Sequence, residues 1–411
     1  MVGTREFRPL ALAEARARGL VDLPIVSVPH PIGGIPEAIV RGKADEGAAA
    51  VLETYRRGTD GRAAALAPAV HEAPDDLLAY QEWILEQGWG DGLPTLPATP
   101  ERVAQLLQGT RRAPVDEVGM LPPRLGRATV EVVAVNAALA GALPEHMPVI
   151  LAAVAAVADP VFNLRAVQST THPCSPLIVV NGPIAARLRI NAAGNALGQG
   201  HRANAVIGRA VRLTLQNAGG ARPGVEDRAT QGHPGKYSYC VAENEGASPW
   251  EPLHVERGFG RDESTVTVIG AEGPHNINDH GSTTAEGILA TVAGTMAQIG
   301  SNNFHAGGEP LVVLGPEHAA TVAAGGWSKA EFKRRLYGAA RVPFGRVSPG
   351  NHESYFRRNP ETFTGVTAES MVPITHRWED LMVIVAGGAG KHSVAVFTFG
   401  NTRAVTRRIE P

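Results

Sequence analysis

A mixed α+β fold is predicted, in which a small, incomplete Rossmann-like α/β fragment precedes a larger α+β domain with glycine-rich loops. Three observations predict it. Near the amino terminus, one mostly apolar strand lies between two helical segments. Further along, two apolar helical stretches are followed by alternating strand and helix patterns. Finally, 47 glycines and 31 prolines interrupt regular structure, so loops and turns make up much of the chain.

The first predicted domain covers residues 1–70. It consists of a helix at 10–18, a strand at 23–28 and, after a proline-rich turn, a helix at 36–55. One strand and two helices cannot close a hydrophobic core, so these residues form a fragment of a layered domain. The stretch 58–74 is rich in alanine, glycine and proline and is predicted to be a linker.

The second predicted domain covers residues 75–411. Asp75 and Asp76 precede its first helix as capping residues, and Thr99 with Pro100 begins the next. Two apolar helices follow within 129–164; neither has the ~20 apolar residues that a membrane span requires, so both are expected in the core. The other predicted helices are 77–87, 203–216, 283–299, 317–324 and 328–338, and the strands are 177–180, 264–269, 310–314, 381–385, 394–399 and 404–409.

Composition excludes several classes of function. Hydrophobic residues make up 44% and charged residues 19%, as in a globular protein. The net charge of −2 gives no basic patch for nucleic acid or a membrane surface. The first residues include acidic side chains and lack an apolar run, so no signal peptide is expected. Two cysteines cannot form a disulfide framework, and a reduced, cytoplasmic setting is predicted.

The polar block 168–259 is predicted to carry an active site. It contains both cysteines and four histidines, woven between glycines and prolines that are typical of loops near a ligand. Eight of the 14 histidines lie between His172 and His318. We therefore expect one pocket, built by residues 168–318, that includes Cys174, His172, His201, His233 and His275.

The catalytic candidates are cysteines and histidines in this block. Cys174 and His172 precede a buried strand and could be a thiolate with its base, or a core cysteine with a turn-capping histidine. His233 lies in a polar loop suited to acid/base work, and the alternative is a tight surface loop. Cys240 is also a candidate, although alternation around it favours a core strand position.

Substrate-binding candidates are polar residues interleaved with these. A glycine-rich segment before the helix 203–216 offers an anion site. The segment 387–392 is predicted to be a hairpin, with an anion-binding loop as the alternative. The proposed substrate-binding residues are Asn181, Asn195, His201, Arg202, Asn204, Lys236, Tyr237 and Glu243.

A second reading places a divalent metal ion in the chain as cofactor. Residues 274–280 combine imidazole, amide and carboxylate groups, and another histidine follows one helix later. Such oxygen and nitrogen ligands would suit a metal-dependent lyase or hydrolase. The candidate ligands are His275, Asp279, His280 and His305.

Two parts of the chain resemble a known family. Residues 4–31, TREFRPLALAEARARGLVDLPIVSVPHP, resemble the carboxyl-terminal half of the UGSC-motif (seleno)protein domain. Residues 88–260 resemble its poorly characterised companion through GWGDGLPTLP, NAALAGALPEHMPVILAAV, NGPI, RANAVIGRAVRL, GKYSYCVAENE and SPWEPLHVERGF. The resemblance implies a thiol- or selenol-dependent oxidoreductase acting on a small molecule.

The chain lacks the family's UGSC-like cysteine motif. We therefore expect either a UGSC- or CGSC-motif partner polypeptide, in a hetero-oligomer, or a reading frame that extends upstream of Met1. The pocket would then be completed by the partner's reactive residue. A third reading is a non-catalytic scaffold that only binds the redox partner.

Overall fold

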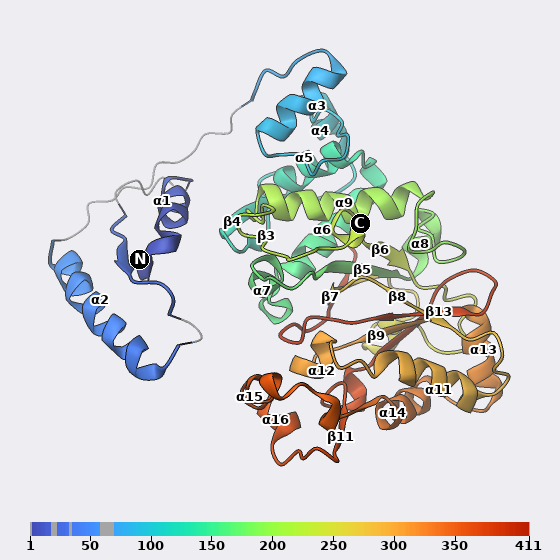
Figure 1. Ribbon diagram of the computed structural model, residues 1–411. Coiled ribbons are helices and arrows are strands. Elements are labelled where there is room, and N and C mark those ends of the chain that lie inside the picture. Colours follow the sequence, from blue (N-terminus) through green and yellow to red (C-terminus); the bar gives the residue numbers. More distant parts are fainter. Residues whose placement is uncertain (1, 18–22, 33–34, 58–69, 411) are drawn as a thin grey trace. The chain divides into compact units, whose positions relative to one another are not determined.

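The computed structural model describes residues 2–17, 23–32, 35–57 and 70–410 (Figure 1). The chain forms two compact units, residues 1–74 and 75–411. Most of the predicted linker, 58–69, lies outside the described residues, as do Gly33 and Gly34 of the predicted turn. Helices and mixed sheets together confirm the predicted mixed α+β class. No helix among the described residues combines the length and apolarity that spanning a membrane would require.

The first unit has a two-stranded parallel sheet, in which β1 (Val2–Thr4) pairs with β2 (Val26–Val28). Helix α1 (Arg8–Ala17) connects the two strands, and α2 (Glu37–Arg57) follows them. Val26 and Val28 are buried, but few other apolar side chains of this unit are. The described residues of this unit thus form one parallel strand pair and two α-helices.

The second unit is built from four layers: helices, sheet, sheet and helices (Figure 1). The first sheet has the order β14-β7-β5-β6, and only its β5–β6 pair is parallel. The second has the order β12-β9-β13-β8, and only its β12–β9 pair is parallel. The strands of the first sheet are β5 (Ser175–Asn181), β6 (Cys240–Ala242), β7 (Thr265–Ala271) and β14 (Val405–Arg408). Those of the second are β8 (His275–Asn278), β9 (Leu311–Leu314), β12 (Met382–Val385) and β13 (His392–Val396).

Three hydrophobic clusters fill the spaces between these layers. Alternate residues of β5 point to opposite faces, as strand geometry requires. Ile178 and Val180 join the cluster under the first helical layer, whereas Leu177 and Val179 join the cluster that also contains Leu311 of the second sheet. Strand β5 is therefore buried on both faces, which explains why its sequence is an unbroken apolar run.

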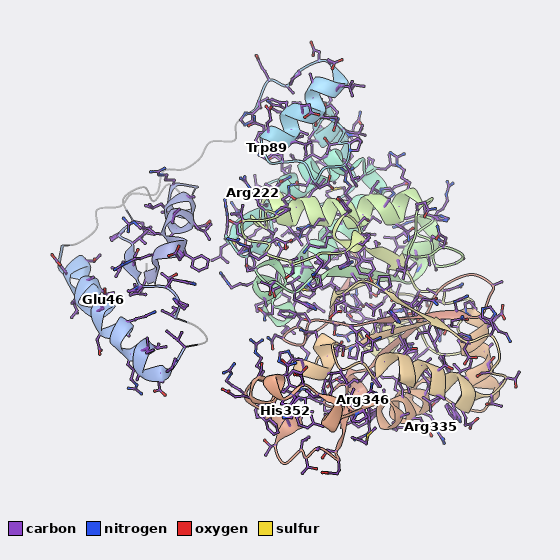
Figure 2. All side chains as sticks on the ribbon, viewed as in Figure 1. Glu46, Trp89, Arg222, Arg335, Arg346 and His352 are labelled. Atoms are coloured by element: carbon purple, nitrogen blue, oxygen red, sulfur yellow. The ribbon has the colours of Figure 1, made fainter. Side chains whose placement is uncertain are left out.

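Helices cover the outer faces of both sheets. On the first sheet lie α5 (Val130–Ala140), α6 (Met147–Val157) and α9 (Arg202–Asn217). On the second lie α11 (Ala285–Met296), α13 (Pro316–Ala324) and α14 (Lys329–Ala339), with α15 (Pro349–Arg358) and α16 (Pro360–Phe363) packed on the same core. Figure 2 labels Arg335 of α14 and His352 of α15 among the side chains of this layer.

The remaining elements are short. Helices α3 (Leu77–Glu86) and α4 (Pro100–Leu107) begin at Asp76 and Thr99, whose side chains accept hydrogen bonds from backbone N–H groups as predicted for capping residues. The others are β3 (Glu117–Leu121), β4 (Gly126–Thr129), α7 (Leu164–Gln168), α8 (Pro183–Arg187), α10 (Leu253–Glu256), α12 (Asn302–Ala306), β10 (Arg341–Pro343) and β11 (Met371–Pro373). Six 3-10 turns complete the described residues: Arg5–Phe7, Pro144–His146, Pro160–Phe162, Pro234–Lys236, Phe344–Arg346 and Trp378–Asp380.

The hairpin predicted at 387–392 is wrong. Strands β12 and β13, on either side of this segment, both pair with β9, which lies between them. The alternative of an anion-binding loop is also not supported, because the Gly390 N–H donates to the Glu317 carboxylate at 2.7 Å. A carboxylate already occupies the position that an anion would take.

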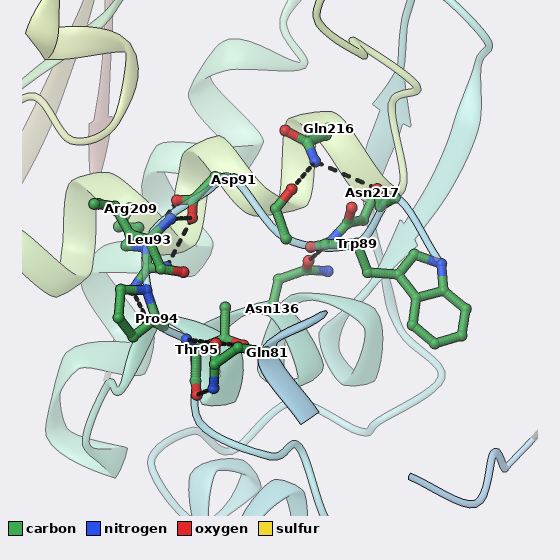
Figure 3. A network of polar contacts seen from close by, with 12 residues as sticks. Gln81, Trp89, Asp91, Leu93, Pro94, Thr95, Asn136, Arg209, Gln216 and Asn217 are labelled. Atoms are coloured by element: carbon green, nitrogen blue, oxygen red, sulfur yellow. Dashed lines mark hydrogen bonds and ion pairs between the residues drawn. The ribbon is translucent and has the colours of Figure 1, made fainter. Parts of the chain in front are cut away.

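A polar clamp fastens the segment 88–95 to α9 (Figure 3). Arg209 donates to both carboxylate oxygens of Asp91 at 2.8 Å and to the carbonyl oxygens of Leu93 and Pro94. Two turns further along α9, Gln216 donates to the carbonyl of Gly90 at 2.8 Å. The polar side chains of α9 on this side therefore bind backbone rather than solvent.

Candidate functional site

The ends of β5 and β7 bring a histidine and a carboxylate together. Ser175 at the start of β5 pairs with Ala271 at the end of β7. His172 lies just before β5 and Glu272 directly after β7. Because these strands are antiparallel, both residues lie at the same end of the two strands. His172 Nε2 lies 2.7 Å from Glu272 Oε1. The two side chains are 14% and 24% exposed, so solvent screens this pair only partly.

The hydrogen bond to Glu272 assigns the tautomer of His172. An ionised carboxylate only accepts hydrogen bonds, so the Nε2 of His172 carries a proton, and in the neutral ring Nδ1 carries the lone pair. Nδ1 is buried and has no hydrogen-bond partner among the described residues. The ring is held in place by stacking on Phe399, with ring centroids 5.1 Å apart. Phe399 comes from the segment after β13, whose backbone pairs with the end of β7 through Gly270.

His233 is the second imidazole of the site. Its Nδ1 accepts a hydrogen bond from the Gly235 N–H at 3.1 Å, so in the neutral ring the proton is on Nε2. Nε2 is buried and has no partner with full hydrogen-bond geometry among the described residues. The ring packs edge-on against Tyr239, whose hydroxyl donates to the backbone carbonyl of Glu272 at 3.1 Å. The same loop therefore holds His233 near the His172–Glu272 pair.

Burial keeps His233 neutral. Burial and the positive charge of Lys236 lower the pKa of His233 to about 4, although the nearby Ala271 carbonyl and Glu272 act in the opposite direction. A proton gained by His172 would lower the pKa of His233 further, because the two rings are close enough for their charges to interact. The N–H of a neutral imidazole is a hydrogen-bond donor, not an acid that starts out charged.

A buried ion network fixes this loop. Asp227 Oδ2 accepts from Lys236 Nζ at 2.8 Å and from Arg212 Nη2 at 2.9 Å. Burial opposes the ionised form, but the two cations together hold the pKa of Asp227 below its usual range. Lys236 also donates to the Cys174 carbonyl at 3.4 Å. Lys236 thus links the loop to the start of β5 and is committed to structural contacts.

Both cysteines that were catalytic candidates lie in the core of the folded chain. Cys174 is 1% and Cys240 6% exposed, and both belong to the cluster under the first helical layer. Burial raises the pKa of each thiol to about 12. Each cysteine is therefore a protonated core residue at neutral pH, which was the alternative considered for both.

We expect both thiols to be inert until the chain unfolds. In native protein, neither Cys174 nor Cys240 should release chromophore from an aromatic disulfide reagent faster than the protein unfolds globally, since the thiolate is the reacting form. Addition of urea should expose two thiols per chain. Rapid modification of one thiol in folded protein would show that Cys174 or Cys240 is reachable after all.

The predicted single pocket divides into two separate clusters. Asn181 and Glu243 lie at the other end of β5 from His172 and Cys174. At ~3.3 Å per residue, the seven-residue strand separates its ends by about 20 Å. Asn181 Nδ2 donates to Glu243 at 2.7 Å, so these two substrate-binding candidates do meet, but at the opposite edge of the sheet.

Most of the other substrate-binding candidates form hydrogen bonds with backbone groups. Asn204 accepts from the Asn191 N–H and donates to the carbonyls of Asn191 and Cys240, which uses its amide fully. Arg202 donates to the Gly141 carbonyl. Asn195 has a positive φ of 58° and donates to its own loop. His201 directly precedes α9 and is exposed, and Tyr237 is 48% exposed.

The four predicted metal ligands do not converge. Asp279 is occupied: burial opposes ionisation, but hydrogen bonds from Thr291 and Ser282 lower the pKa of Asp279 to about 2. His280 instead approaches His392, at 3.3 Å between Nε2 atoms. His275 is exposed on β8, and His305 packs on Tyr355 at 4.6 Å. Across the described ranges, no three histidine, cysteine, aspartate or glutamate side chains are grouped to hold a metal ion.

Sequence reasoning missed Glu272, Phe399 and Tyr239. Glu272 follows the predicted strand 264–269 closely, and an acidic residue after a buried strand is a usable signal. Phe399 could not have been assigned, because it reaches the site only through pairing between the two sheets. No known protein-family model matches the chain, and a search of curated proteins also found no match.

The low pKa of His233 makes stability depend on pH. The unfolded chain binds this proton near the ordinary histidine pKa of 6.5, whereas the folded chain binds it only near pH 4. The stabilising contribution is therefore complete above pH 6.5 and is lost as pH falls towards 4. Because the ring is partly exposed, we expect about 1 to 2 kcal/mol rather than the full value.

The measurement is urea unfolding of wild type and His233→Asn between pH 7 and pH 4.5. The loss of stability over this range should be smaller in His233→Asn, and Oδ1 of the asparagine can still accept from Gly235. His201→Asn controls for removal of an exposed imidazole. Identical pH profiles for wild type and His233→Asn would contradict the prediction.

Proposed function

We propose that His172, Glu272 and His233 form the acid–base site of an enzyme that acts on a small molecule. The main support for this proposal is the 2.7 Å contact between His172 Nε2 and Glu272, which in the neutral ring leaves the buried Nδ1 with a free lone pair. In this role Glu272 orients the ring and stabilises it when protonated. Nδ1 of His172 removes a proton, and the neutral His233 donates its Nε2–H to an oxygen that gains negative charge.

A thiol or selenol from a partner would be a suitable proton donor. Proton transfer from S–H or Se–H to His172 Nδ1 would leave a thiolate or selenolate beside an imidazolium, the arrangement that activates such nucleophiles. Both thiols of this chain are buried and protonated, so the reactive group would come from outside it. The oxidoreductase class itself rests on the resemblance to the UGSC family, and a cytoplasmic setting would keep such a group reduced.

The first unit supports the proposal of a UGSC- or CGSC-motif partner. Parallel sheets are normally covered on both faces and contain more than two strands, yet among the described residues of this unit β1 and β2 pair only with each other. Val2, Ile39 and Leu52 are 58%, 50% and 56% exposed within a small unit. A partner that adds strands to this sheet would complete its core.

The partner proposal is tested by co-purification. The full chain is expressed with a CGSC-motif polypeptide, and a complex of defined stoichiometry is expected by size-exclusion chromatography with light scattering. Ile39→Asp should abolish the complex, whereas Asp45→Asn on the same helix should not. If the two chains elute separately, or if Ile39→Asp has no effect, α2 is not part of such an interface.

The acid–base proposal is tested by proton exchange. Wild type, with and without the CGSC-motif partner, is incubated in D2O with a mixture of small organic acids, ketones and amides. Mass spectrometry then measures deuterium uptake and new products. Turnover that disappears in His172→Gln supports the proposal. Turnover that survives His172→Gln and His233→Asn would contradict it, and absence of binding to any small molecule would favour the scaffold reading.

The metal-dependent lyase or hydrolase is the weaker candidate. Of its predicted ligands, Asp279, His280 and His305 contact other residues, and His275 is exposed on β8. No observation of the described residues favours it over the acid–base site.

A further inference from the structure

A second buried polar cluster lies at the opposite edge of the first sheet, where β5 and β6 end. We call it the β5–β6 polar cluster. It is separated from His172 by the length of β5 and uses none of the acid–base residues. Its members are Asn181, Glu243, Glu245, His254 and Thr265.

Hydrogen bonds, an ion pair and a cross-strand pairing join these residues into one group. Asn181 Nδ2 donates to Glu243 Oε2 at 2.7 Å and to Glu245 Oε1 at 3.0 Å. Glu245 Oε1 lies 3.9 Å from Nδ1 of His254. Thr265 is the direct cross-strand partner of Asn181 on β7. Residues this close share one local environment, between the two sheets.

Four side chains of the cluster have a buried polar atom without a hydrogen-bond partner. Asn181, His254 and Thr265 are 0% exposed, and Glu243 is 4% exposed. Buried polar groups without partners are rare in folded proteins, and four in one place call for an explanation. The unpartnered atoms are Asn181 Oδ1, Glu243 Oε1, His254 Nδ1 and Thr265 Oγ1.

These atoms need hydrogen-bond donors. Oxygen atoms of Asn181 and Glu243 can only accept while the carboxyl group is ionised. Turning the Asn181 amide over would place its oxygen against two carboxylates, so its assignment is secure. Nε2 of His254 faces the carbonyl of Arg261 at 3.3 Å and therefore carries the proton, which leaves Nδ1 as an acceptor. Thr265 Oγ1 can accept as well.

The cluster also contains no lysine or arginine side chain. Glu243 and Glu245 are two carboxylates whose close partners are an amide and backbone N–H groups. Lys329 favours the ionised form of Glu243, but its ammonium group pairs with Glu256 at 3.2 Å. Burial accordingly raises the pKa of Glu243. A cation that donates hydrogen bonds would supply both the donors and the charge.

We propose that the β5–β6 polar cluster binds one ammonium-type cation, either free ammonium or the protonated amine of a small molecule. A metal ion fits less well, because no three charged or imidazole ligands converge among the described residues. Hydrogen bonds of 2.7 to 3.1 Å tolerate the wider spacing that metal coordination does not. Water would supply donors but would leave the buried Glu243 carboxylate and the half-buried Glu245 carboxylate beside it without positive charge.

Access is provided at Glu245. Its side chain is 25% exposed, whereas the other members are almost completely buried. It lies in the loop 243–250 that follows β6, of which Gly246 and Ala247 are exposed. A cation entering past this loop would meet Glu245 first and the buried acceptors behind it. A free ion and a terminal amine would make the same contacts, so the experiment must separate these two sources.

The test is thermal unfolding of the full chain at constant ionic strength. Ammonium chloride or methylammonium chloride should raise the unfolding temperature in a saturable manner, by about 2 to 4 °C. Potassium chloride matches the size of ammonium, and tetramethylammonium chloride carries the charge without N–H donors; neither should cause the shift. Propylammonium chloride distinguishes the sources, since a site for an amine-bearing molecule accepts it and a site for free ammonium does not.

Two variants and one control make the result specific. Glu243→Gln should abolish the ammonium-dependent shift, and it should be at least as stable as wild type without the ligand because it removes a buried charge. Thr265→Val keeps the shape of the side chain and should weaken ammonium binding about tenfold. Glu251→Gln, an exposed position in the following segment, should behave as wild type. The proposal is overturned if neither ammonium nor methylammonium raises the unfolding temperature of wild type, or if potassium raises it equally. It is also overturned if both variants retain the full ammonium-dependent shift.

Discussion

Replacing Glu272 by Gln should lower turnover of any substrate found for this site by about 10²- to 10⁴-fold. The amide keeps the shape of the side chain but cannot hold His172 as a carboxylate does. It can donate to Nε2, which would move the ring proton to Nδ1, the atom that must accept the substrate proton. The measurement is kcat, combined with the ¹⁵N chemical shifts of the His172 ring, which report the tautomer directly.

A structural effect of Glu272→Gln can be separated from this chemical one. The backbone of residue 272 is fixed independently, by the Tyr239 hydroxyl and by pairing with Phe397. The unfolding temperature of the Glu272→Gln variant should therefore stay close to that of wild type. The control is Glu251→Gln, which should leave both kcat and the His172 spectrum unchanged. An unchanged kcat with a reversed tautomer would show that His172 is not the base.

Local features of the fold were largely predictable from the sequence. Asp76, Thr99 and Pro100 mark helix starts because capping depends on residues within one turn. The apolar runs that became β5 and β7 were also recognisable, although each extends beyond its predicted end. What could not be derived is which strands pair. The insertion of β9 between β12 and β13 depends on contacts between distant segments, and it removed the predicted hairpin at 387–392.

The site was predicted less well, because cysteines and histidines that are close in the sequence were expected to be close in space. Cys174 and Asn181 lie in the same short segment, but a fully extended strand carries their side chains to opposite sheet edges. Glu272 lies 100 residues from His172, and the antiparallel register of β5 with β7 makes them neighbours. Burial likewise cannot be read from a motif: the His-Pro-Cys sequence at 172–174 gives one accessible edge residue and one core thiol.

Replacing Arg209 by Met should reduce the free energy of unfolding by about 3 to 5 kcal/mol. Arg209 and Asp91 are only 13% and 6% exposed, and their two 2.8 Å hydrogen bonds form a bidentate pair (Figure 3). Methionine keeps most of the apolar stem but leaves Asp91 buried without its cation. It also leaves two backbone carbonyls, of Leu93 and Pro94, without their donor.

Arg357→Met is the matched control for this prediction. Arg357 pairs with Glu353 one turn earlier on α15, at 3.6 Å, and the two side chains are 64% and 91% exposed. Exposed pairs of this kind contribute about 0.3 to 0.5 kcal/mol, so its loss should hardly change the urea midpoint. Tryptophan fluorescence gives a local readout, since the Trp89 carbonyl accepts from Asn217 beside the clamp. Equal midpoints for Arg209→Met and Arg357→Met would mean that the segment 88–95 is held to α9 by its apolar contacts, with Trp89 packed on Trp83, and that the buried ion pair adds little.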